Sequence, residues 1–262
     1  MKVHQGELDP IRLYNMKMTN SQPNLSLVAT TLASVTLLAR LGAPLAFAQT
    51  CTPPPAGLVG WWSGDGHYFD LVGTNHGAPS SGASFAAGKV GPSFSLNSDG
   101  AAVTIAHNPM LDVPLTGFTA GFWMQGVKNQ PQSIYLVVDK SHGWGDSTGW
   151  LFQGYSDSGR IFFGIGAGGP DINNFPLATS TTDVLDGQWH HVAGTWDGAA
   201  LLIFVDGAQQ AQAALTIPFN NTRPVNLGYS WGGGAPNRFF RGNVDELGIY
   251  NRALTPGETN KL

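Results

Sequence analysis

Apolar and polar residues alternate most clearly within residues 186–207, and this pattern predicts two neighbouring strands. The first spans residues 188–196 and the second spans residues 201–206, and an Asp-Gly pair closes each of them. Glycine adopts positive φ at little cost and Asp can bond the nearby backbone, so these pairs predict tight turns. Trp189 and Val192 differ in parity within the first strand, so we expect a bulge or a late strand start there.

The second of these predicted strands is apolar on both faces. Leu201, Ile203 and Val205 share one face by the two-residue period of a strand, and Leu202 and Phe204 share the other. We therefore expect this strand to lie inside a sheet, with both of its sides covered.

Other short apolar segments, bounded by Gly, Asn, Asp and Pro, predict further strands. They are residues 58–62, 101–105, 118–125, 134–140, 150–155, 160–165, 215–218, 225–228 and 240–250. No segment alternates ten-residue helical patterns with strands, which argues against an α/β fold. About ten short strands without an internal repeat predict an all-β protein built as a two-sheet antiparallel sandwich.

Three segments resemble the laminin-G-like jelly roll of the concanavalin A-like lectin/glucanase superfamily. Residues 186–207 contain Asp-Gly-x-Trp-His-His-Val-Ala, then Thr-Trp-Asp-Gly, then an apolar strand closed by Val-Asp-Gly. Residues 65–77 follow an aromatic strand and contain Asp-Gly, Asp70 and Gly-x-Asn-x-Gly, and residues 251–258 read Asn-Arg-Ala-Leu-Thr-Pro-Gly-Glu. The resemblance covers about residues 56–262 and implies an antiparallel jelly-roll sandwich.

The N-terminal region has the features of a secretory signal peptide. Residues 25–39 form an apolar run with a lysine upstream, and residues 46–48 read Ala-Phe-Ala, a typical cleavage site. Met16 and Met18 are the expected alternative start sites, because fifteen or more residues otherwise precede any signal-like feature. We therefore predict a signal peptide over residues 1–48.

The rest of the chain divides into two parts. Residues 49–56 form a short Pro-rich lead-in, and residues 57–262 form the predicted jelly-roll domain. Removal of the signal peptide would leave a secreted, periplasmic or cell-surface protein. We expect no membrane insertion after this cleavage, and Arg40 leaves the unbroken apolar run before it too short to span a membrane comfortably.

The charge argues against a nucleic-acid-binding protein, and the cysteine content excludes a fold held by internal disulfides. Residues 1–48 hold four of the 13 Lys and Arg and two of the 17 Asp and Glu. The remainder therefore carries nine basic and fifteen acidic residues, a net charge of −6, which is wrong for a nucleic-acid-binding protein. The single cysteine, Cys51, forms no internal disulfide, and we interpret it as a bystander or a tether.

Candidate catalytic residues are few, and we expect no enzyme activity. Glycoside hydrolases need two carboxylates across a cleft. The nearest pair is Asp245 and Glu246, but neighbours on a regular strand point to opposite faces. His190 and His191 have no metal-ligand partner at a known spacing, so we interpret them as structural. A glycoside hydrolase of the superfamily stays an open alternative.

The loop that follows the first predicted strand is rich in oxygen ligands suited to Ca²⁺. It offers Asp65, Asp70 and Asn75 in a glycine-rich setting. Calcium-binding proteins of the resembled family hold the ion through loop acids and carbonyls, and Asp245 would join if the first and last strands pair. The alternative is that these loop residues only cap turns.

Two glycine-rich loops predict a ligand-binding surface. Trp144 and Trp231 lie in these loops, with Asp146, Asn237 and Arg238 nearby. Aromatic rings and directional polar groups are typical of carbohydrate sites, although packing that anchors the loops is the alternative. The remaining tryptophans on predicted strands are expected in the core: Trp61, Trp62, Trp123, Trp189 and Trp196.

These observations favour a secreted, non-catalytic module that binds a glycan or an extracellular protein, with calcium as the expected cofactor. The alternatives are a glycoside hydrolase and an adhesion or structural surface module that binds no sugar.

Overall fold

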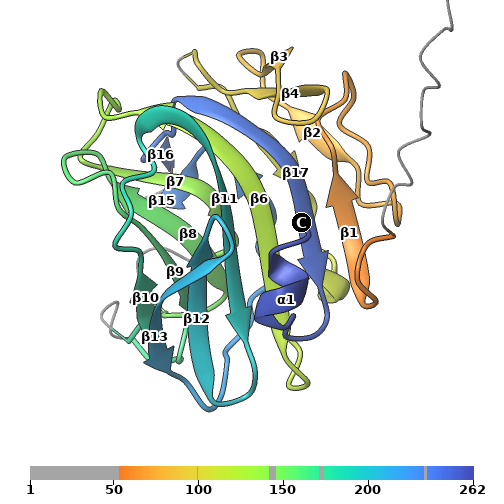
Figure 1. Ribbon diagram of the computed structural model, residues 1–262, viewed down its shortest axis with the longest axis vertical. Coiled ribbons are helices and arrows are strands. Elements are labelled where there is room, and N and C mark those ends of the chain that lie inside the picture. Colours follow the sequence, from red (N-terminus) through yellow and green to blue (C-terminus); the bar gives the residue numbers. More distant parts are fainter. Residues whose placement is uncertain (1–52, 99, 142–145, 171–173, 233–234) are drawn as a thin grey trace, which may run out of the picture. The chain divides into compact units, whose positions relative to one another are not determined.

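The computed structural model describes residues 53–98, 100–141, 146–170, 174–232 and 235–262. These residues form an eight-stranded sheet, a seven-stranded sheet and a small two-stranded sheet, all with antiparallel pairing (Figure 1). The predicted all-β, two-sheet antiparallel sandwich is confirmed. The predicted signal peptide lies outside the described residues and stays a prediction.

The eight-stranded sheet contains the first and last strands of the domain. Its order is β13, β12, β11, β6, β17, β4 and β3, and β1 also pairs with β17. The strands are β1 (Leu58–Trp62), β3 (Ser84–Ala87), β4 (Pro92–Ser95), β6 (Phe118–Val127), β11 (Asp186–Trp196), β12 (Ala200–Val205), β13 (Ala208–Ala214) and β17 (Gly242–Tyr250).

The seven-stranded sheet forms the second layer. Its order is β10, β9, β8, β7, β14, β5 and β2. The strands are β2 (Gly77–Pro79), β5 (Val103–Ile105), β7 (Ile134–Asp139), β8 (Trp150–Tyr155), β9 (Ile161–Ile165), β10 (Leu177–Thr179) and β14 (Val225–Leu227). A hairpin of β15 (Ser230–Gly232) and β16 (Ala235–Asn237), a 3₁₀ turn at Pro109–Leu111 and a short helix α1 (Pro256–Thr259) complete the described elements.

Alternate side chains of both sheets fill the space between them. Phe118 and Phe122 of β6 are fully buried and meet Phe152 and Phe163 of the other sheet. The rings of Phe122 and Phe152 lie 4.9 Å apart and almost perpendicular, an arrangement that aromatic pairs prefer. The two-residue period of the strands thus sends one side of each sheet into a single core.

Most strands lie where the sequence predicts them. β1 and β8 have the predicted bounds, and β12 lies between β11 and β13, as its two apolar faces require. The pairing of β11 with β6 shifts register between Asp186 and Trp189, which confirms the bulge. β17 begins at Gly242 rather than Phe240, because Phe240 still belongs to the connection from the hairpin.

β13 is a strand that the sequence pattern does not predict, and the strand predicted over residues 215–218 does not form. β13 reads Ala-Gln-Gln-Ala-Gln-Ala-Ala, which has low strand propensity. Its pairing follows from the tight turn at Asp206 and Gly207, where φ is 50° and 75°. Such a turn directs the chain straight back along β12, so backbone pairing overrides propensity.

Candidate functional site

The outward side of the eight-stranded sheet carries aromatic and polar side chains. Trp123 of β6 is paired with His191 of β11 and with Asp245 of β17. Gln125 is paired in the same way with Trp189 and with Asn243, and directly paired residues point to the same side of a sheet. We call this surface the open face; it comprises Trp61, Trp123, Trp189, Gln125, Asn243, Asp245 and Glu246.

The expectation that all strand tryptophans belong to the core is wrong for three of them. Trp62 and Trp196 are 1% exposed and lie in the core. Trp61, Trp123 and Trp189 are partly exposed and lie outside it. The sequence of β6 did indicate the outward position of Trp123. By the two-residue period of a strand, Trp123 shares a face with polar Gln125, whereas Phe122 and Met124 share the other face.

A chain of amides crosses the open face beside the tryptophans. Gln125 Nε2 donates to the Gly187 carbonyl at 2.9 Å, and Asn243 Nδ2 donates to Gln125 Oε1 at 3.1 Å. Asn97 Nδ2 donates in turn to Asn243 Oδ1 at 2.9 Å. Lys89 Nζ lies 4.6 Å from the ring centroid of Trp123, a cation–π distance. The face therefore combines aromatic surface with oriented donors and acceptors.

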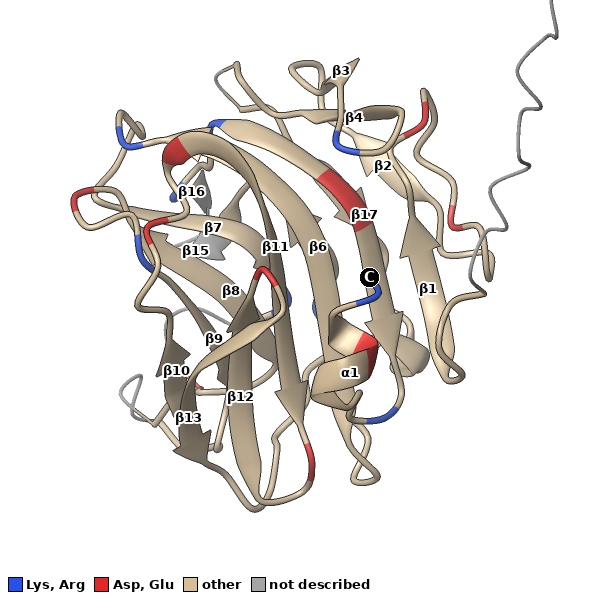
Figure 2. Cartoon of the chain, in the orientation of Figure 1, with Lys and Arg blue, Asp and Glu red and all other residues tan. Residues whose placement is uncertain are grey.

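The acidic residues of β17 interrupt the regular strand. Figure 2 shows them as a red segment within β17, while most of the other strand surface is uncharged. The pairing of β17 with β6 shifts between Asp245 and Gly248, and Glu246 has φ 55°. Trp61 Nε1 donates to Glu246 Oε2 at 2.5 Å. The bulge thus places both acids on the open face, so the alternation argument against this pair is wrong.

Burial makes both acids harder to ionise. Burial raises the pKa of Asp245 to about 6, although the backbone N–H groups of Val90 and Lys89 donate to its Oδ2 at 3.0 and 2.9 Å. Burial also raises the pKa of Glu246 to about 7, and the charges of Asp245 and Asp65 add to that rise. Asp245 Oδ1 is buried and accepts no hydrogen bond from any described residue.

The structure divides the predicted calcium ligands into two groups. β1 pairs with β17 as expected, and Asp65 lies close enough to Asp245 for its charge to raise the pKa of Asp245. Asp70 accepts hydrogen bonds from the backbone of Trp61 and from the backbone and side chain of Asn75 at 3.1–3.3 Å. Asp70 and Asn75 therefore hold the turn. Across the described ranges, no three His, Cys, Asp or Glu side chains form a metal-ligand group.

The predicted ligand loops lie near the other sheet. Asn237 is paired with Ser230 in the hairpin, and Arg238 accepts a hydrogen bond from Leu136 N at 2.9 Å through its carbonyl. Burial raises the pKa of Asp139 at the end of β7, while the Ser230 hydroxyl and the Arg238 charge oppose this rise. The hairpin therefore lies beside the end of β7.

The other predicted loop residues are only partly described. Asp146 accepts a hydrogen bond from Thr148 Oγ1 at 2.6 Å within its own loop. Trp231 belongs to β15, and its backbone is paired with that of Pro236. The position of its side chain is not among the features that the structure describes. Trp144 lies outside the described residues altogether. The ligand role of these loops stays a prediction.

The two histidines of β11 have different environments. His190 bonds Asp206 Oδ2 through Nδ1 at 2.8 Å and Asp186 Oδ1 through Nε2 at 3.1 Å. Burial works against protonation of His190, but these carboxylates outweigh it and raise its pKa. His191 is 5% exposed, and burial lowers its pKa to about 4. His190 thus supports the turn at Asp206. His191 is neutral, and its ring centroid lies 5.3 Å from that of Trp123.

Comparisons with known proteins agree with this architecture. The model of a family described as the concanavalin A-like lectin/glucanases superfamily, Laminin_G_3, matches residues 97–260. Pappalysin-1 of Mus musculus is 26% identical over 181 residues, which are 64% of this chain and 11% of that protein. The chain thus spans about a tenth of the length of this relative.

Solved structures share the fold at low sequence identity. The binding domain of Paraclostridial Mosquitocidal Protein 1 superposes with a TM-score of 0.62 and 14% identity, covering 78% of this chain and 51% of that one. Domain 4 of AbnA, a GH43 extracellular arabinanase from Geobacillus stearothermophilus, in complex with arabinotriose, superposes with a TM-score of 0.55 and 18% identity. The match covers 78% of this chain and 96% of that one.

None of the helices within the described part of the chain has the length and apolar character needed to cross a membrane.

Proposed function

The chain belongs to the concanavalin A-like lectin/glucanases superfamily, and we propose that it is a secreted, non-catalytic module that binds carbohydrate on its open face. The observation that carries this proposal is the row of partly exposed tryptophans in register with amide side chains. Trp123 and Trp189 supply apolar ring surface, and Gln125 and Asn243 supply directional polar groups. Saccharides have apolar ring faces and hydroxyl edges, so they need both kinds of group.

Neighbouring structures support a binding role. One is described as the binding domain of a mosquitocidal protein, and another as a domain of an arabinanase in complex with arabinotriose. An extracellular protein is the alternative ligand, as in an adhesion module that binds no sugar. A glycan array probed with the exported chain separates the two. Binding of a defined group of glycans supports the proposal, and an empty array would leave a protein ligand.

We also propose that Ca²⁺ stabilises the region where β1 meets β17. The predicted ligands that the fold brings near one another there are Asp65 and Asp245, and backbone carbonyl oxygens of the loop would complete the coordination, because the described His, Cys, Asp and Glu side chains form no group of three. The buried Asp245 Oδ1 that no described residue bonds is a suitable ligand atom. Burial raises the pKa of Glu246, and the charges of Asp245 and Asp65 add to that rise; a cation nearby would relieve this repulsion.

Glycoside hydrolysis is a second candidate function, favoured by one observation. Asp245 and Glu246 share the open face, and their pKa values are raised to about 6 and about 7, as a general acid requires. Asp245, however, is fully buried beneath the backbone N–H groups that follow β3, so it does not face a substrate. Glycans bound on the array should be incubated with the chain and with Glu246→Gln. Release of reducing sugar by the parent alone would establish the enzyme.

Export is the remaining part of the proposal. The apolar run of residues 25–39 and the Ala-Phe-Ala site support it. N-terminal sequencing of the exported protein should begin at Gln49. An uncleaved product inside the cell would reject secretion.

A further inference from the structure

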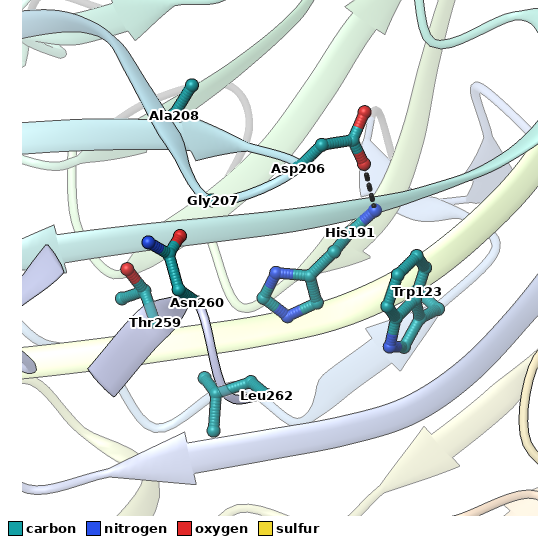
Figure 3. A pocket seen from close by; sticks show the side chains of 8 residues that line it. All are labelled: Trp123, His191, Asp206, Gly207, Ala208, Thr259, Asn260 and Leu262. Atoms are coloured by element: carbon teal, nitrogen blue, oxygen red, sulfur yellow. Dashed lines mark hydrogen bonds between the residues drawn. The ribbon is translucent and has the colours of Figure 1, made fainter. Parts of the chain in front are cut away.

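A pocket of about 490 Å³ opens beside Trp123 on the open face (Figure 3). This volume lies within the roughly 300–1,000 Å³ that is typical of small-molecule sites. Its lining includes Trp123, His191, Asp206, Ala208, Asn260 and Leu262. The pocket therefore joins the middle of the sheet to the β12–β13 turn and to the segment that ends α1.

Several polar groups in this pocket have no partner among the residues the structure describes. The ring nitrogens of His191, the indole N–H of Trp123 and the side-chain amide of Asn260 make none of the hydrogen bonds observed there. His191 is nevertheless 5% exposed and lies between Trp123 and Leu262 in Figure 3. Neither ring nitrogen is among the buried atoms that lack a partner, so both are open to the solvent of the pocket, and a ligand hydroxyl could bond them in place of water.

The charged side chain in the lining of the pocket is acidic, which favours a neutral ligand over an anion. Asp206 is fixed at the rim, because its Oδ2 bonds His190 Nδ1 at 2.8 Å and its Oδ1 accepts from His191 N at 2.9 Å. His191 is uncharged at neutral pH, because burial lowers its pKa to about 4. The pocket thus presents one carboxylate, neutral donors and acceptors, and an aromatic wall.

The shape of the turn keeps the pocket in place. Gly207 has φ 75°, and a side chain there would collide with Asn260. Glycine at this position therefore lets the segment after α1 approach the turn closely. Two parts of the chain that are more than fifty positions apart in sequence thereby form adjoining parts of the pocket lining.

We propose that this pocket binds one neutral sugar ring, which packs against Trp123 and bonds His191 through a hydroxyl group. The inference rests on the proposed function and names the ligand class of its central subsite. A hydroxyl can both donate and accept, so it suits an imidazole with one of each.

Saturation-transfer NMR on the full chain tests this proposal. The probes are the methyl glycosides of glucose, galactose, mannose, arabinose and N-acetylglucosamine, with N-acetylneuraminic acid as the anionic comparison. Ala208→Trp fills the rim of the pocket, and Ala214→Trp is the matched control on another exposed position of β13. His191→Phe keeps ring packing and removes both nitrogens. Melting curves verify that each variant is folded.

The proposal expects at least one neutral glycoside to bind the parent and Ala214→Trp. Ala208→Trp should abolish binding, and His191→Phe should weaken it roughly tenfold. Neutral glycosides that bind both folded pocket variants as tightly as the parent would overturn the pocket and leave carbohydrate binding intact. Preferential binding of N-acetylneuraminic acid would overturn the neutral class. A glycan array without any bound glycan, together with silent NMR probes, would overturn both proposals.

Discussion

The outward sides of the two sheets differ in what they leave accessible. On the eight-stranded sheet, Trp123 and Trp189 are partly exposed beside Gln125 and Asn243. On the seven-stranded sheet, the outward side chains of Leu136 and Phe162 are 1% and 3% exposed. Ile134 and Phe175 pack over that second group and form a small satellite cluster. This second surface, which we call the covered face, is therefore filled by the chain itself around Leu136 and Phe162, while Tyr155, whose ring lies 5.5 Å from that of Phe162, is 42% exposed.

Polar residues of the covered face also bond one another. Thr104 Oγ1 donates to Asn226 Oδ1 at 3.3 Å and lies 3.1 Å from Tyr229 Oη. Asp139 accepts from the backbone and the hydroxyl of Ser141 at 2.9 and 2.6 Å. Polar groups therefore bond one another on both faces, and on the open face the partly exposed rings of Trp123 and Trp189 lie beside them. The comparison teaches that the open face differs by combining several partly exposed tryptophans with a row of oriented amide side chains.

The largest expected effect is the difference in stability between removing a core tryptophan and removing a tryptophan of the open face. Trp196 is 1% exposed and donates from Nε1 to the Leu215 carbonyl at 2.8 Å. Trp196→Ala should lower the free energy of unfolding by about 3–5 kcal/mol, because it empties a core site. Trp189→Ala should cost less than about 1 kcal/mol, since the ring is partly exposed. Urea unfolding of both variants measures the difference, and equal losses would place Trp189 in the core.

Calcium should stabilise the open face where β1 meets β17. A ligand that binds only the folded state at a hundred times its Kd stabilises it by roughly 2.7 kcal/mol. Added Ca²⁺ should raise the melting temperature of the parent, and Asp245→Asn should remove the rise. Asp139→Asn, a buried acid of the covered face, is the matched control and should keep it. Identical curves in Ca²⁺ and chelator would leave Asp65 and Asp245 without a metal role.

The acids of the open face should also make stability depend on pH without metal. The folded-state pKa values of Asp245 and Glu246 are raised, so their stabilising contribution is complete below the unfolded-state pKa. It is lost as the pH rises through about 6 and about 7. In chelator, the melting temperature of the parent relative to Asp245→Asn/Glu246→Gln should therefore fall by a few degrees between pH 5 and pH 8. A difference that does not change with pH would contradict the raised values.

The sequence allows the sandwich and most strands to be predicted, because alternation and Asp-Gly turns are local signals. The parity of Trp123 was also readable, since its outward neighbour Gln125 is polar. The bulge at Glu246 could not be predicted from the sequence, because nothing in the local sequence indicates that this non-glycine residue adopts a φ of 55°. The pocket could not be predicted either. Its walls at His191 and Asn260 meet only through tertiary folding.

Titration of one array-positive glycan into two variants tests the central claim most directly. Trp123→Ala changes the open face, and Arg238→Ala changes the hairpin beside the end of β7, where the sequence predicted a ligand contact. The account predicts that Trp123→Ala weakens binding by roughly 1–3 kcal/mol, the loss expected for an aromatic anchor. Arg238→Ala should leave the Kd unchanged, with both variants folded by circular dichroism. Loss of binding in Arg238→Ala and an unchanged Kd in Trp123→Ala would contradict the open face as the ligand surface.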